Sequence, residues 1–88
     1  METEDVARKR LSMRAWRRGT REMDLILGPY ADARLSVMDG AGLALFDALL
    51  DENDQDLLPW VLGQKPPSDR FAALLGDIAD HARTRLAR

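Results

Sequence analysis

The sequence predicts an all-α fold, a small compact bundle of five helices, and three observations support this prediction. Residues with branched β-carbons are few, and no stretch alternates polar and apolar residues as a strand would. Alanine, leucine, arginine and methionine, which favour helices, are frequent. A chain of 88 residues holds one hydrophobic core. We therefore expect a single helical domain over residues 1–88, with flexible ends at about residues 1–4 and 87–88.

The first helix is predicted over residues 5–17. Val6, Leu11 and Met13 give it a weak apolar stripe. Gly19 follows in the position of a C-terminal stop, because a residue without Cβ adopts the left-handed conformation at little cost.

The second helix is predicted from about Thr20 to about Ala33. Its interior contains Gly28 and Pro29. Because proline removes a backbone donor and disfavours helical geometry in the residue before it, we expect a kink or a short break there. Residues 34–38 then form a connection.

The third helix is predicted over residues 40–50, with Asp39 as its N-cap. Its apolar positions share one face, and they are Leu43, Phe46, Leu49 and Leu50.

The fourth helix is predicted over residues 55–62, with Asp54 as its N-cap and Gly63 as its stop. Pro59 lies beyond the first turn, so we expect this helix to be bent or very short. Trp60 is interpreted mainly as a core residue.

The fifth helix follows a stiff Lys65-Pro66-Pro67 linker and is predicted to run to about Leu86, with Ser68 as its N-cap. Its apolar stripe is the most regular in the chain, and it comprises Phe71, Leu74, Leu75, Ile78, Ala82 and Leu86.

Composition excludes several classes of site. The sequence contains no cysteine, which rules out disulfides, thiolate nucleophiles and zinc knuckles, and its one histidine is His81. No apolar run is long enough to span a membrane, and the first 22 residues lack the apolar segment of a secretory signal. We therefore expect a binding module or accessory protein of the bacterial cytoplasm, with no metal and no membrane insertion.

Charge is segregated along the chain. Residues 1–22 contain seven basic residues and four acids, whereas residues 39–56 contain six acids and no base. Solvated helix faces explain such charges individually. The segregation also suggests that the protein is oriented on a charged partner.

Residues 17–24 concentrate the chemistry of the sequence. Arg18 provides a planar fork for a carboxylate, phosphate or carbonyl, Gly19 permits close approach of another backbone, and Glu22 adds the opposite charge. Arg17 and Asp24 flank them. A purely structural interpretation is also open: Glu22 reaches back as in a capping box, and it pairs with Arg18.

Residues 17–27 resemble the Arg-Gly-x-x-Glu signature of the succinate dehydrogenase assembly factor 2 family, the flavinators. Residues 45–50 are similar to that family's Phe-x-x-Leu-Leu segment, and residues 54–63 to its Asp-x-Asp-Leu-Phe-x-Trp helix. The order and spacing agree over about residues 8–80. Pro59 departs from the family pattern, where a polar residue is usual.

The resemblance implies a five-helix assembly factor that promotes covalent attachment of FAD to the flavoprotein subunit of succinate dehydrogenase, with fumarate reductase as a second client. Arg18, Gly19 and Glu22 would form the client-contacting patch, with contributions from Arg17 and Asp24. FAD and its acceptor histidine would belong to the client, so this chain would bind no cofactor stably and would have no catalytic residue. We expect a monomer.

Three alternatives stay open. The arginine-rich first helix suits a nucleic-acid-binding module, although the acidic total charge disfavours it. A helical regulatory module with an unrelated client is a second alternative. A small enzyme that uses the carboxylates of Asp54 and Asp56 is a third.

Overall fold

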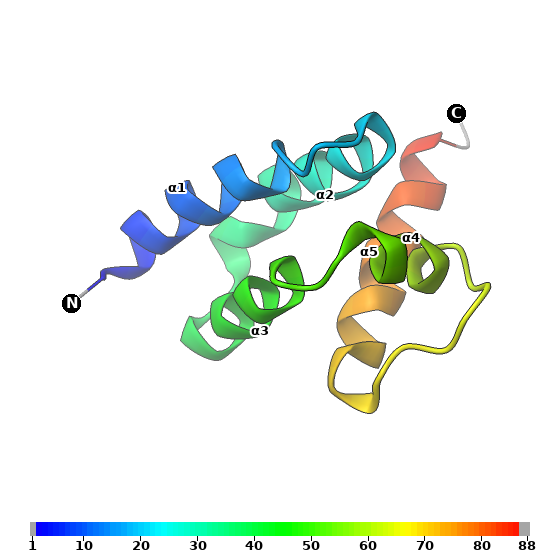
Figure 1. Cartoon of the computed structure of the whole chain (residues 1–88). Coiled ribbons are helices and arrows are strands. Elements are labelled where there is room, and N and C mark those ends of the chain that lie inside the picture. Colours follow the sequence, from blue (N-terminus) through cyan, green and yellow to red (C-terminus); the bar gives the residue numbers. More distant parts are fainter. Residues whose placement is uncertain (1, 87–88) are drawn as a thin grey trace.

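Five α-helices follow one another along residues 2–86, the part of the chain that the computed structural model describes (Figure 1). Two short 3₁₀ turns, Leu35–Val37 and Asp69–Phe71, connect some of them, and the described residues include no strand. The all-α prediction with five helices is confirmed. The helices are α1 (Glu4–Ala15), α2 (Arg21–Arg34), α3 (Gly40–Leu50), α4 (Asp54–Val61) and α5 (Ala72–Leu86).

Side-chain caps fix the starts of the first three helices. The hydroxyl oxygen of Thr3 accepts from the Val6 N–H at 3.2 Å, and that of Thr20 from the Met23 N–H at 3.4 Å. The Asp39 carboxylate accepts from the Gly42 N–H at 2.8 Å, which confirms the predicted cap of α3.

Of the kink or short break predicted at Pro29, the break is wrong, because α2 continues through Pro29 to Arg34. Proline has no N–H, so the Leu25 carbonyl one turn earlier lacks its helical donor. The guanidinium of Arg85 in α5 donates to that carbonyl at 2.9 Å. A side chain distant in sequence therefore satisfies the carbonyl that proline leaves open.

Other boundaries also differ from the predictions. Asn53, not Asp54, is the N-cap of α4, and Asp54 lies inside the first turn. α4 has only eight residues, as expected for a very short helix. Ser68 precedes the 3₁₀ turn Asp69–Phe71, and α5 begins only at Ala72. α1 ends at Ala15, two residues earlier than expected.

The core lies where α1, α2 and α3 pack together and where α5 covers α2 and α4 (Figure 1). Its largest fully buried side chains are Tyr30, Phe46, Leu11, Met23, Leu27, Leu49, Leu50, Leu57 and Ile78. Trp60 is half-buried and packs on Phe71, with 6.3 Å between ring centroids. The stripe predicted for α1 is wrong at Val6 and Met13, which are exposed, since only Leu11 of that stripe is buried.

None of the described helices combines the length and apolar character that crossing a bilayer requires. At the amino-terminal end, Thr3 caps α1 and Glu2 pairs with Arg10 at 2.7 Å. The flexible ends expected at residue 1 and at residues 87–88 lie outside the described residues.

Candidate functional site

The chain turns between α1 and α2 at the segment 16–20, which we call the α1–α2 corner. Gly19 has a φ of +103°, a conformation that side chains with Cβ rarely adopt. No atom outside its immediate neighbours lies within 4 Å of a Cβ built there, so the backbone faces open space. The N–H of Arg18 donates to the Asp24 carboxylate at 2.6 Å, which ties the corner to α2.

The guanidinium of Arg18 points into its own chain. Its Nε donates to Asp54 Oδ1 at 3.0 Å, and its Nη2 donates to the Glu52 carbonyl at 2.6 Å. Its Nη1 donates to the Leu50 carbonyl, and the side chain is only 11 % exposed. The sequence suggested that the Arg18 guanidinium binds a partner. In the structure it instead joins the α1–α2 corner to the turn between α3 and α4.

The remaining predicted site residues divide by exposure. Arg17, Gly19 and Glu22 are exposed, whereas Asp24 is half-buried beneath the corner. Because Thr20 is the N-cap, Glu22 is the second residue of α2 and not the third, so the capping-box interpretation is wrong. Arg18 pairs with Asp54 and not with Glu22. The accessible part of the predicted patch is thus Arg17, Gly19 and Glu22.

Three arginines of α1 and the corner form ion pairs with three aspartates, and we call these pairs the Arg–Asp ladder. They are Arg10, Arg14 and Arg18 with Asp47, Asp51 and Asp54. Arg10 and Arg14 both bind Asp47, at 2.9 and 2.6 Å, Arg14 also binds Asp51 at 2.9 Å, and Arg18 binds Asp54 at 2.9 Å. Sequence reasoning missed the ladder. Its signal was the spacing of residues 10, 14 and 18, four residues apart, which is close to the spacing of four and three in residues 47, 51 and 54.

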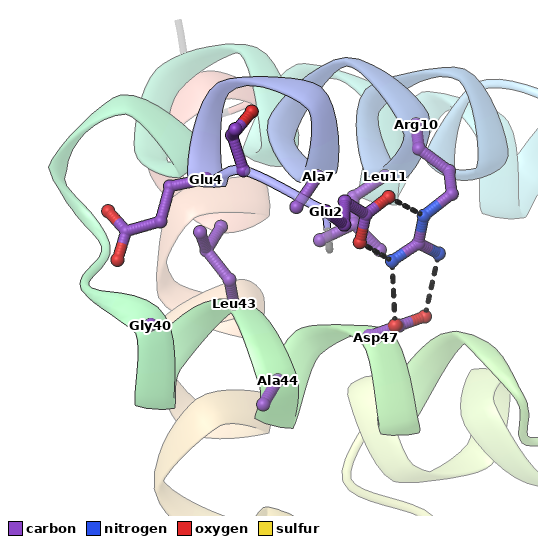
Figure 2. Close-up of a pocket in the computed structure, with 10 residues that line it drawn as sticks. Glu2, Glu4, Ala7, Arg10, Leu11, Gly40, Leu43, Ala44 and Asp47 are labelled. Atoms are coloured by element: carbon purple, nitrogen blue, oxygen red, sulfur yellow. Dashed lines mark hydrogen bonds and ion pairs between the residues drawn. The ribbon is translucent and has the colours of Figure 1, made fainter.

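Figure 2 shows the Arg10 guanidinium between the carboxylates of Glu2 and Asp47, beside a hollow of about 240 Å³ between α1 and α3. The hydrogen bond from Arg10, and then the charges of Arg10 and Arg14, hold the pKa of Asp47 below its ordinary value, although burial opposes the shift. Asp47 is therefore a charged anchor between the two helices.

The ladder changes the interpretation of the charge segregation. Arg10, Arg14 and Arg18 are matched by acids of the 39–56 segment, so three of the seven basic residues of the first segment are neutralised by the second. Arg8 is also paired, with Glu4 at 3.3 Å. The cationic surface that the nucleic-acid alternative required is correspondingly reduced.

Two chemical possibilities find little support at the corner. A hollow of about 580 Å³ lies beside Arg18, but the acids Asp51, Glu52 and Asp54 line it and its two arginines are already paired. This lining does not suit the pyrophosphate of FAD. The carboxylate of Asp54 is engaged by Arg18, so it is not free to act as a base with Asp56.

His81 lies on α5, away from the corner, and is half-buried with its ring edge-on to Tyr30 at 5.7 Å between centroids. Within residues 2–86, no group of three or more histidines or acids is arranged to hold a metal ion.

Comparison with known proteins gives a consistent result. A model of the family described as "Flavinator of succinate dehydrogenase" matches residues 9–82. A "Succinate dehydrogenase assembly factor 2, mitochondrial" of Cryptococcus neoformans is 38% identical over 84 residues, covering 93% of this chain and 48% of that protein. One of Aspergillus flavus is 41% identical over 71 residues, covering 78% of this chain and 24% of that protein.

A bacterial relative is also similar. The "FAD assembly factor SdhE" of Acetobacter pasteurianus is 30% identical over 79 residues, covering 89% of this chain and 72% of that protein. The chain thus spans about half the length of the Cryptococcus relative and most of the Acetobacter one.

Proposed function

Because this chain belongs to the family of flavinators of succinate dehydrogenase, we propose that it binds the flavoprotein subunit of that enzyme and promotes covalent attachment of FAD to it. The observation that carries the proposal is the match of residues 9–82, which includes the whole α1–α2 corner. Fumarate reductase is a second client that we propose on the same basis.

The corner suits a docking role because it is both exposed and fixed. A client can reach three exposed residues here, Arg17 and Gly19 in the corner and Glu22 at the start of α2. The absence of a side chain at Gly19 lets a client backbone come close. Arg18 beneath them holds the corner against the turn between α3 and α4. A surface that is ordered before binding loses little conformational entropy when it binds.

The chain acts in this proposal as an accessory factor without an active site of its own. FAD stays a group of the client, and the covalent bond to the client's histidine forms within the client. The corner contributes by binding one conformation of the client more tightly than others, because only differential affinity shifts a conformational population. We propose that it does so as a monomer in the bacterial cytoplasm.

The test is the covalent flavin content of the client. Deleting the gene should remove most flavin fluorescence from the denatured flavoprotein subunit on a gel, and a plasmid copy should restore it. The subunit's abundance, measured by immunoblot, serves as the control. Unchanged covalent flavin in the deletion strain, with the subunit present at normal abundance, would contradict the proposed function.

A further inference from the structure

The outward face of α1 carries two aliphatic side chains that the core does not use. Val6 is 53 % exposed and Met13 is 55 % exposed. They are seven residues apart, so they lie on one face of the helix. Leu11 and Ala15, the buried residues of α1, lie on the opposite side, against α2 and α3.

A shallow groove of about 540 Å³ follows this face, and we call it the α1 groove. Its lining residues are Val6, Lys9, Arg10, Met13, Arg14 and Arg17. Arg10 and Arg14 direct their guanidinium groups to Asp47, so they offer the groove their aliphatic stems. Within residues 2–86, no acid pairs with Lys9 or Arg17 at ion-pair distance. The groove is thus apolar along its floor and cationic at Lys9 and Arg17.

We propose that the α1 groove is a second part of the client-docking surface, which takes an apolar side chain of the flavoprotein subunit that is flanked by carboxylates. This inference rests on the proposed function and specifies its binding surface. The apolar side chain sits between Val6 and Met13, and the carboxylates pair with Lys9 and Arg17. Arg17 belongs to both the groove and the α1–α2 corner, so the two surfaces are continuous.

Two other occupants are distinguished by the test below. A second copy would have to offer an exposed acid such as Asp56 to Lys9 and Arg17, together with an apolar side chain that fits between Val6 and Met13. Helices that lie on membranes present a broad apolar face with bulky side chains. The α1 groove is shallow and offers only one valine and one methionine, which suits a single protruding side chain.

The test compares matched substitutions of exposed aliphatic residues. Val6→Glu and Met13→Glu place a carboxylate in the groove, whereas Val37→Glu places one at a valine that is 74 % exposed and lies outside the groove. The dissociation constant for the purified flavoprotein subunit is measured by calorimetry. Each groove variant should weaken binding roughly tenfold, the usual scale of a loss at an interface anchor, and Val37→Glu should leave it unchanged. Circular dichroism checks that all three variants fold.

The outcomes separate this inference from the proposed function. If the unsubstituted chain binds the subunit and both groove variants bind equally well, the groove assignment is overturned and the proposed function stands. If the unsubstituted chain does not bind the subunit, both the groove assignment and the proposed function fail.

Two further experiments test the other occupants: binding of the chain to vesicles containing phosphatidylglycerol, and sedimentation of the chain alone. Vesicle binding or dimerisation that both groove variants abolish, with client binding retained, would overturn the inference in favour of that occupant.

Discussion

The guanidinium of Arg18 lies where the α1–α2 corner, the end of α3 and the start of α4 meet. Two of its acceptors, the carbonyls of Leu50 and Glu52, belong to a region where a helix ends and its carbonyls lack helical donors. The sequence could place Arg18 at a corner. It could not show which way the side chain turns, because its acceptors lie more than thirty residues away in the chain.

Replacing Arg18 should therefore destabilise the fold. Arg18→Lys removes the planar fork, so the two carbonyls and the Asp54 carboxylate cannot all keep a donor. We expect the free energy of unfolding to fall by about 2 kcal/mol in urea titrations followed by circular dichroism. Arg17→Lys, at the exposed neighbour, should change it by less than about 0.5 kcal/mol. If the free energy of unfolding falls equally in the two variants, the hydrogen bonds of the Arg18 guanidinium do not stabilise the fold.

Gly19 and Gly63 provide a matched pair for the docking role of the corner. Both have positive φ, at +103° and +74°, and neither has an atom within 4 Å of a built Cβ. Gly19→Arg and Gly63→Arg should each cost about 1–3 kcal/mol of backbone strain and still fold. Only Gly19→Arg should fail to restore covalent flavin in the deletion strain, because its side chain covers the surface beside Glu22. Restoration by both variants would argue against docking at the corner.

Helices show how far local sequence patterns reach. Asp39 caps α3 as the capping pattern predicts, because the cap is satisfied within three residues. Pro29 does not break α2, and the Leu25 carbonyl that lacks its helical donor is bound by Arg85, sixty residues after Leu25. Asp54 is not a cap, because its carboxylate is drawn to Arg18. The sequence predicts a helix boundary correctly where the residues that determine it are close in the chain. The errors occur where a side chain distant in sequence determines it.

The packing of Trp16 on α2 predicts opposite effects for two helical glycines. A Cβ at Gly28 would overlap the ring of Trp16, whose Nε1 is held by Asp32 at 3.2 Å. Gly28→Ala should lower the free energy of unfolding by about 1–3 kcal/mol through overpacking. Gly76→Ala, in α5 with no atom near the new Cβ, should raise it by about 0.5–1 kcal/mol through helix propensity. Thermal unfolding measures both, and a gain for Gly28→Ala would show that Trp16 moves aside freely.

At the scale of the whole molecule, the charges organise the packing. The sequence shows a basic segment and an acidic segment, and from this it predicted orientation on a charged partner. In the structure the two segments lie together, because α1 packs on α3, and the Arg–Asp ladder joins them. Fold class and helix order follow from composition and periodicity. The ladder depends on which helices become neighbours, and the sequence does not specify that locally.

The ladder predicts a loss of stability in acid. The pKa of Asp47 is lowered by Arg10 and Arg14 in the folded chain, so its contribution is complete above the unfolded value of about 3.9 and is lost as the pH falls through the lower folded value. Asp47→Asn should cost about 1 kcal/mol at pH 7, since the side chain is partly solvated, and the difference from the unsubstituted chain should vanish in acid.

Urea midpoints at neutral pH and at pH values well below 4 measure this difference. Asp69→Asn, which changes an exposed acid outside the ladder, is the control and should behave like the unsubstituted chain at both pH values. A difference for Asp47→Asn that persists in acid would mean that the loss arises from packing and not from charge.

The ladder also fixes the register of α1 along α3. The paired positions rise together in both segments, so α1 and α3 run in the same direction (Figure 1), and the two helices pack directly on each other. If α1 slid by one turn, one arginine at one end and one aspartate at the other would lose their partners, and the partly covered Asp54 would make that slip costly. The ion pairs of the ladder therefore also determine where Val6 and Met13 lie relative to α3 and the rest of the molecule.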